Sequence, residues 1–165
     1  MSFVAGIPTL DIQDFTKGNQ ELRNKFVKNL GDAYESIGFV AIHGHGIPDT
    51  LIEDLYTQSQ DFFGLSPEQK KAYARPETNN QRGFVRMGVE HAKDSEAADL
   101  KEFWQVGQPN PPSDADLVHF PPNSNVSETP QFKATAEQAF EALENLGQIM
   151  LQAIAIHLNV EESYF

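Results

Sequence analysis

The segment that decides the fold is Ser36–Leu65, SIGFVAIHGHGIPDTLIEDLYTQSQDFFGL. Its early part, FVAI at residues 39–42, is a short apolar run typical of a buried strand. A turn rich in glycine and histidine follows, and Pro48 stands where the first turn of a helix accepts proline. Apolar residues at helical spacing come next, so the segment predicts a strand, a turn and an amphipathic helix.

The residues that precede this unit predict a strand and a helix. Residues 7–12, IPTLDI, favour a short edge strand or an extended segment, because proline cannot donate to a strand ladder. Residues 13–19 are predicted to be a loop that enters a helix. Residues 20–37 carry apolar side chains three or four apart, which predicts one helical face, and Gly38 is typical of a helix end.

The residues that follow predict shorter elements and one long helix. Ser66-Pro67-Glu68-Gln69 has the pattern of a capping box and predicts a short helix. Residues 82–88 and 100–107 are predicted to be extended. Thr129-Pro130 is expected to open the longest helix, and residues 159–165 to begin a further one.

Composition limits the function classes. The 165 residues suffice for one domain with a core, and the net charge of −12 disfavours nucleic acid and anionic membranes as partners. The chain has no cysteine, which excludes disulfides and thiolate ligands. No apolar run approaches the ~20 residues that span a bilayer, and the N-terminus lacks the pattern of a signal peptide. We therefore expect a cytoplasmic protein.

The turn contains a candidate metal site. His43 and His45 form an H-x-H pair, and Asp49 follows four residues later. On a strand, residues i and i+2 face the same way, so both imidazoles would reach one metal ion. The structural alternative is that the histidines form hydrogen bonds in the turn and the glycines supply backbone freedom. No H-x-D, H-x-E, G-x-S-x-G or phosphate-loop motif occurs in the sequence.

A second candidate site combines arginine with aromatic residues. Arg82, Phe84 and Arg86 lie close together in the sequence, and Trp104 stands in the other extended segment. Two guanidinium groups beside glycine and aromatic side chains would clamp a carboxylate through paired hydrogen bonds. The alternative is that both arginines pair with acidic side chains at the surface.

The motifs occur in an order that resembles a known family. IPTLDI, GFVAIHGHGIP, SQDFFGLSPEQKKAY, RGFVRMG and DLKEFWQVG together resemble the N-terminal region of the iron(II)- and 2-oxoglutarate-dependent dioxygenases, in the isopenicillin-N-synthase-like branch. Gly44 departs from the family pattern, which has asparagine there, whereas His45, Gly46 and Ile47 match it. The resemblance covers residues 5–165.

The resemblance implies an α+β fold that is mostly helical, with a few short strands that would extend the double-stranded β-helix, or jelly roll, of the full-length family. Residues 1–165 would form the non-haem dioxygenase N-terminal domain, and the catalytic β-helix domain would be absent from this chain. Fe(II) and 2-oxoglutarate are implied for the full-length enzyme, but their ligands belong to that later domain. We therefore assign no catalytic residue and no metal ligand here, and expect neither cofactor to bind this chain alone.

The resemblance also implies a role in an oxidoreductase that acts on a small organic molecule. The N-terminal region supplies scaffold and one wall of the substrate pocket, which places Arg82, Phe84, Arg86 and, less directly, Trp104 near substrate. Two alternatives remain open. One is a stand-alone binding or oligomerisation module that self-associates through exposed sheet edges, and the other is a small metal protein that uses His43, His45 and Asp49.

Overall fold

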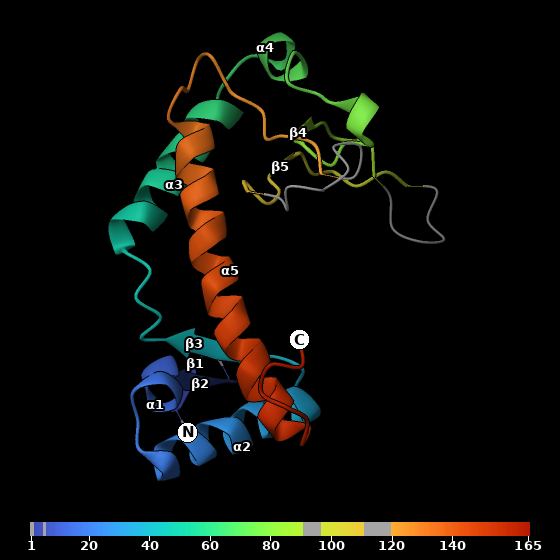
Figure 1. Ribbon diagram of the computed structural model, residues 1–165. Coiled ribbons are helices and arrows are strands. Elements are labelled where there is room, and N and C mark those ends of the chain that lie inside the picture. The colour runs from blue at the N-terminus through green and yellow to red at the C-terminus, as the bar shows by residue number, and fades with distance from the viewer. Residues whose placement is uncertain (1, 5, 91–96, 111–119) are drawn as a thin grey trace. The chain divides into compact units, whose positions relative to one another are not determined.

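The computed structural model describes residues 2–4, 6–90, 97–110 and 120–165, and it divides into two compact units (Figure 1). The terminal unit comprises residues 1–47 and 143–165, and the central unit comprises residues 48–142. The longest helix, α5 (Phe132–His157), begins in the central unit and ends in the terminal unit.

A three-stranded sheet lies in the terminal unit. Its strands, in the order β1-β2-β3, are β1 (Ser2–Val4), β2 (Ile7–Asp11) and β3 (Ala41–His43). β2 pairs antiparallel with β1 and parallel with β3. The strand or extended segment predicted at residues 7–12 is confirmed as β2, but the predicted edge position is wrong, because β2 lies between β1 and β3. The chain reverses at Gly6, where φ is +84°, and this turn lets β1 cover the free side of β2.

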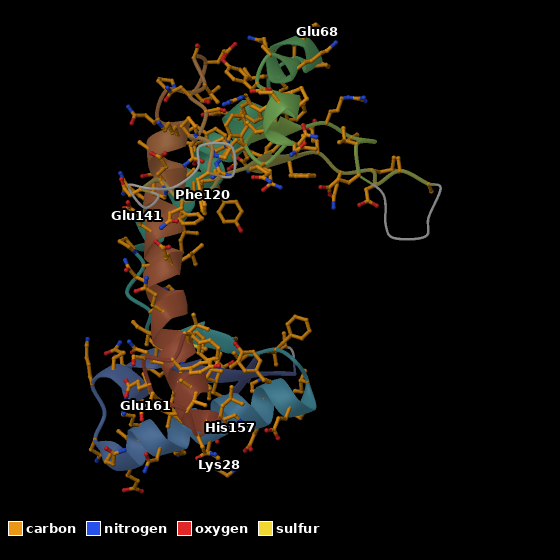
Figure 2. The ribbon with its side chains drawn as sticks, turned by 45° about the vertical axis from the view of Figure 1, so that its right-hand side comes forward. Lys28, Glu68, Phe120, Glu141, His157 and Glu161 are labelled. Atoms are coloured by element: carbon orange, nitrogen blue, oxygen red, sulfur yellow. The ribbon has the colours of Figure 1, made fainter. Side chains whose placement is uncertain are left out.

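Two helices precede β3 in the terminal unit. α1 (Ile12–Thr16) replaces part of the predicted loop, because the Asp11 carboxylate accepts a hydrogen bond from the Gln13 N–H at 2.9 Å and caps the helix. α2 (Gln20–Ser36) confirms the predicted helix and is followed by Gly38 at φ +80°. Lys28 is an exposed residue of this helix (Figure 2). It forms an ion pair with Asp32, one turn further along.

The core of the terminal unit brings the sheet, α1, α2 and the later part of α5 together. Its buried side chains are Leu10, Ile12, Phe15, Phe26, Val27, Leu30 and Ala153. Burial of this apolar surface, at about 25 cal/mol per Å², is the main stabilising contribution to the unit.

The central unit combines short helices with a hairpin. Its elements are α3 (Asp49–Phe63), α4 (Pro67–Lys71), the 3-10 turn η1 (Pro76–Thr78), β4 (Gly83–Val85), β5 (Phe103–Gln105) and the first turns of α5. The predicted capping box is confirmed, since the Ser66 hydroxyl accepts from the Gln69 N–H and the Gln69 side chain accepts from the Ser66 N–H. β4 and β5 pair antiparallel, with Phe84 opposite Trp104.

Two predicted boundaries and one predicted element differ from the structure. The strand expected at residues 39–42 begins at Ala41, and α5 begins at Phe132, after a turn in which the Phe132 N–H donates to the Thr129 carbonyl. The segment after α5 is a turn and not a helix. Asn159 adopts φ +56°, and the Val160 N–H donates to the Ala155 carbonyl, which closes the helix end.

The described residues form an α+β fold in which helix predominates over strand, as expected. None of the helices in these ranges has the length and apolar content needed to cross a membrane.

Candidate functional site

The histidine turn has a structural role that its backbone explains. β3 ends at His43, and Gly44 and Gly46 adopt φ +69° and +73°, so the strand alternation that would align His43 with His45 is broken. His45 Nδ1 accepts a hydrogen bond from the Ile47 N–H at 3.1 Å. A Cβ on Gly44 would collide with Asp11 Oδ1, so this position requires glycine for space as well as for φ. The hydrogen bond of His45 and the conformations of Gly44 and Gly46 are those that the structural alternative for the turn expects.

The surroundings of His43 offer few donors for a metal ion. His43 Nδ1 lies 3.7 Å from Asp11 Oδ2, and these two side chains are a pair and not a triad. Across residues 2–4, 6–90, 97–110 and 120–165, no group of three or more His, Asp or Glu side chains is arranged to hold a metal ion. The described residues therefore do not fit the ligand set that iron needs, and we derive no step through iron.

Phe84 and Trp104 belong to the aromatic core of the central unit. The ring of Phe62 is fully buried at the centre of this cluster, and its centroid lies 4.7 Å from Trp104 and 5.9 Å from Phe84. The rings of Phe63, Tyr73 and Phe132 also contact Phe62. These contacts fix the hairpin β4–β5 against α3 and the start of α5, so Phe84 and Trp104 determine where the hairpin lies.

Arg82 is buried just before β4, with only 7% of its surface exposed. One terminal nitrogen donates to the Gln81 carbonyl at 2.7 Å, whereas Nε has no hydrogen-bond partner in the described structure. The guanidinium group lies so close to Gly107 that a Cβ there would collide with it. Burial lowers the pKa of Arg82 from its ordinary value, although the group stays charged. Among the described residues, Arg82 does not form the surface ion pair that the alternative interpretation expected.

Arg86 lines a pocket between α4 and the hairpin. This hairpin pocket, with a volume of about 290 Å³, is lined by Pro67, Lys70, Lys71, Phe84, Arg86, Met87 and Glu102. Phe84 and Arg86 are two residues apart on one extended segment, which explains why both reach it. Arg82 does not line this pocket, so the structure does not bring two guanidinium groups together there.

A buried ion pair forms one side of the hairpin pocket. Lys70 is 8% exposed, and its Nζ lies 2.7 Å from Glu102 Oε1 and 3.1 Å from the Phe63 carbonyl. The same ammonium lies 5.7 Å from the centroid of the Phe84 ring. Lys70 and Glu102 were not predicted as site residues. The signal that would have found them is their position in two of the motifs, SPEQK and DLKE.

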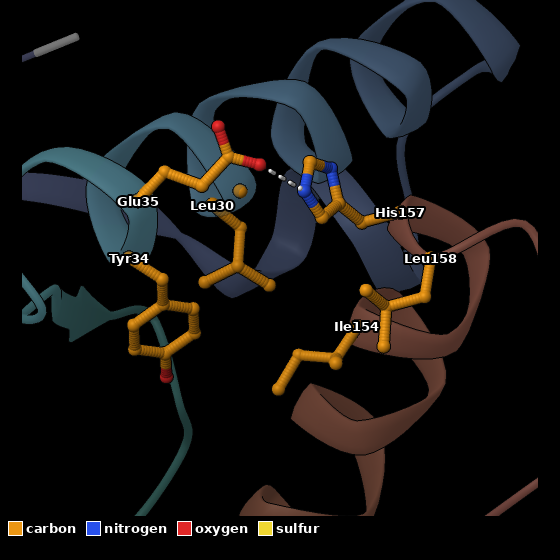
Figure 3. Close-up of a pocket in the computed structure, with 7 residues that line it drawn as sticks. Leu30, Tyr34, Glu35, Ile154, His157 and Leu158 are labelled. Carbon is orange, nitrogen blue, oxygen red and sulfur yellow. Dashed lines mark hydrogen bonds and ion pairs between the residues drawn. The ribbon is translucent and has the colours of Figure 1, made fainter.

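A further pocket of about 250 Å³ lies in the terminal unit, between α2 and the end of α5 (Figure 3). Leu30, Tyr34 and Ile154 make its walls apolar. His157 Nε2 forms a hydrogen bond with Glu35 Oε1 at 3.1 Å at its edge. The imidazole packs on Gly31, and this contact joins the two helices.

Comparison with known proteins identifies the family. The model of the family described as the N-terminal region of non-haem dioxygenases in morphine synthesis matches residues 7–131. The chain belongs to this family. The predicted resemblance to the N-terminal region of the 2-oxoglutarate-dependent dioxygenases is thereby confirmed.

Several relatives of this non-haem dioxygenase N-terminal region are named as 2-oxoglutarate-dependent dioxygenases or oxidoreductases. It is 31% identical over 166 residues to the proline hydroxylase buaE of Petromyces alliaceus, with 96% of this chain and 50% of that enzyme covered. It is 25% identical over 164 residues to the validamycin A dioxygenase of Streptomyces hygroscopicus subsp. limoneus, with 96% of this chain and 45% of that enzyme covered.

Solved structures agree with this family. A 2OG-Fe(II) oxygenase family protein from Caulobacter crescentus matches with a TM-score of 0.81 and 30% identity, over 96% of this chain and 50% of that protein. A full-length Neurospora crassa protein, solved in complex with alpha-KG and thymine, shares the fold at a TM-score of 0.77 and 24% identity, over 96% of this chain and 50% of that protein. The chain thus spans about half the length of the relatives it matches.

Proposed function

We propose that this chain is the N-terminal part of an Fe(II)- and 2-oxoglutarate-dependent oxidoreductase that oxidises a small organic molecule. The observation that carries the proposal is the family match over residues 7–131, joined to relatives that continue for about the same length again. Iron and 2-oxoglutarate would supply the oxidising chemistry in that further half. This chain supplies scaffold, and it is inactive alone.

The proposed contribution to the substrate pocket comes from the hairpin and its flanks. Phe84 and Trp104 pair across the two strands and pack on Phe62, so they hold the hairpin rigid. Arg86 lines the hairpin pocket, and Arg82 is a buried cation whose Nε has no hydrogen-bond partner among the described residues. A rigid apolar wall with a few polar groups is typical of small-molecule sites. These four residues are our candidates for substrate contact.

Turnover of 2-oxoglutarate tests the proposal. The purified chain is mixed with Fe(II), ascorbate and 2-oxoglutarate, and succinate is measured. We expect no succinate above the level of the protein-free mixture. Robust succinate formation would show that the catalytic apparatus lies within these 165 residues and would contradict the proposal.

A chimera provides the positive arm of this test. The matching half of the Caulobacter crescentus oxygenase is replaced by this chain, because the two align over 96% of this chain with a TM-score of 0.81. We expect the chimera to form succinate from 2-oxoglutarate. A folded chimera that binds iron but forms no succinate would contradict the role as scaffold. An H-x-D…H segment in the reading frame downstream of Phe165 would support it independently.

A stand-alone module that assembles with itself is the second candidate. It is favoured by one observation, the edge strand β3, beside which Phe39 exposes 66% of its surface. An exposed edge with adjacent apolar surface promotes strand pairing between molecules. In that case assembly, and not oxidation, would be the function of the chain.

A further inference from the structure

The hairpin pocket combines an apolar floor with positive charge. The Phe84 ring, Met87 and Pro67 supply apolar surface, whereas Lys70, Lys71 and Arg86 supply three cations. Glu102 is the one acidic side chain among the lining residues, and it is paired with Lys70. The lining therefore carries a net charge of about +2, in a chain whose net charge is −12.

Two of these cations have no acidic partner among the residues that the structure describes. In the part of the chain that the structure describes, neither Lys71 nor Arg86 forms an ion pair, and Arg86 makes only a long hydrogen bond of 3.5 Å to the Met87 carbonyl. Acidic side chains outnumber basic ones by 24 to 12 in this chain, so partners for both are plentiful. Cations left free beside a cavity raise the local concentration of anions.

The buried Lys70 gives the pocket a fixed polar side. Its ammonium has three donors, and Glu102 and the Phe63 carbonyl accept from it at 2.7 and 3.1 Å. These bonds hold the side chain over the Phe84 ring, so Lys70 and Phe84 form a preorganised surface. Arg86 and Lys71 line the same cavity, and both residues are exposed.

We propose that the hairpin pocket binds a small organic anion, whose carboxylate or phosphate group lies beside Arg86 and Lys71 and whose apolar portion lies on Phe84 and Met87. The assignment of this anion as the substrate rests on the function proposed above, and it names small organic anions as the substrate class. The planar guanidinium of Arg86 suits either head group, because it donates two parallel hydrogen bonds. The cavity of about 290 Å³ accommodates a molecule of the size of a substituted benzene.

Three matched probes test the ligand class. The isotope-labelled 165-residue chain is titrated with phenylacetate, phenyl phosphate and the neutral phenylacetamide, and backbone amide signals are followed by NMR. We expect saturable shifts at Phe84, Met87 and Glu102 with at least one anion, and affinity for the amide weaker by about tenfold or more, since a charge-assisted hydrogen bond is lost. The tighter of the two anions identifies the head group.

Matched variants locate the binding. Arg86→Gln is expected to weaken binding of the tighter anion by about tenfold, because a charge-assisted hydrogen bond is lost. Since Arg86 is exposed, its replacement is expected to leave the fold intact. Lys17→Gln removes an equal charge from the end of α1, in the other unit, and is expected to leave binding unchanged. Lys71→Gln tests the second cation in the same way.

Three results would overturn the inference: no saturable shift at the pocket, equal affinity for acid and amide, or equal losses in Arg86→Gln and Lys17→Gln. The succinate assay of the chimera does not depend on these probes. If the chimera is active but the chain binds none of the anions, the proposed ligand class is rejected and the proposed function stands. If the chain binds an anion but the chimera is inactive, the ligand class stands and the proposed function is rejected.

Discussion

Lys70 and Glu102 come from different motifs and meet in one ion pair in the central unit. Their side chains are 10% and 24% exposed, so water screens the pair only in part. Removing one partner from such a pair leaves a charge without its counterion, whereas removing both leaves an apolar contact. The two residues are therefore expected to depend on each other energetically.

A double-mutant cycle measures this dependence. Glu102→Gln is expected to lower the free energy of unfolding by about 2 kcal/mol, because the Lys70 ammonium stays buried without its carboxylate. Lys70→Met combined with Glu102→Gln should cost less than the sum of the two single changes. Chemical denaturation supplies the free energies. Lys71→Met, at the exposed neighbouring position, serves as the control and should change stability by less than about 0.5 kcal/mol.

Gly31 and Gly147 provide a second test at the residue scale, because they sit in helices with opposite surroundings. A Cβ on Gly31 would collide with the His157 ring, whereas a Cβ on Gly147 would meet no described atom within 4 Å. Gly147→Ala should stabilise by about 0.5–1 kcal/mol, as alanine does inside helices. Gly31→Ala should destabilise by about 1–3 kcal/mol, because the imidazole must move away from Glu35. Thermal or denaturant unfolding of both variants checks the opposite signs, and a stabilised Gly31→Ala would contradict the packing of α2 on α5.

Between elements, Tyr73 ties the end of α4 to the segment that precedes α5. Its hydroxyl donates to Glu128 Oε2 at 2.6 Å and accepts from the Ser127 N–H at 2.9 Å. The hydrogen bond from Tyr73 is the largest of the causes that lower the pKa of Glu128 below its ordinary value. The charged form of the Glu128 carboxylate is therefore the form that holds the segment before α5 against Tyr73.

The lowered pKa gives the link a defined pH dependence. Because the folded pKa of Glu128 is below the unfolded one, its stabilising contribution is present above the unfolded pKa and is lost as pH falls through the folded pKa. Tyr73→Phe should raise the pKa of Glu128 toward its ordinary value. NMR titration of the Glu128 carboxyl carbon measures this change. Tyr56→Phe, at an exposed position on α3, should leave it unaltered, and an unaltered pKa in Tyr73→Phe would contradict the link.

Elements with a local signal were predictable from the sequence, and elements set by distant partners were not. The period of α2 and the capping box of α4 depend on neighbouring residues, and both appear as expected. The central place of β2 depends on β1 folding back at Gly6, which no pattern in residues 7–12 reveals. α1 was missed because it has 5 residues and depends on a single Asp11 cap, too short a segment for periodicity to show.

The site was predictable only as residue types. The sequence singled out arginine beside aromatic residues, and the structure places Phe84 and Arg86 at one pocket. It did not show that Arg82 would be buried against Gly107, because that contact joins segments far apart in the chain. The sequence also did not reveal the ion pair between Lys70 and Glu102, because two residues 32 positions apart have no local pattern that links them.

At the scale of the whole molecule, the two units each have a core, but their short sheets leave edges unpaired within the described residues. β3 ends the order β1-β2-β3, and the second sheet has two strands only. Such edges carry free N–H and C=O groups that another chain would satisfy. Leu100 and Phe39 add exposed apolar surface, at 90% and 66% of their areas. We expect these surfaces to promote self-association of the isolated chain.

We therefore expect the isolated chain to form a dimer or larger assembly, with β3 as its contact edge. Phe39→Lys should shift the assembly toward monomer, because a lysine beside an edge strand hinders pairing and the exposed position tolerates it. Light scattering across a concentration series measures the mass. Tyr56→Lys, which adds the same charge at an equally exposed site on α3, should retain the wild-type mass. A monodisperse monomer of the unaltered chain at high concentration would show that these edges are too short to pair, and the stand-alone module would lose its support.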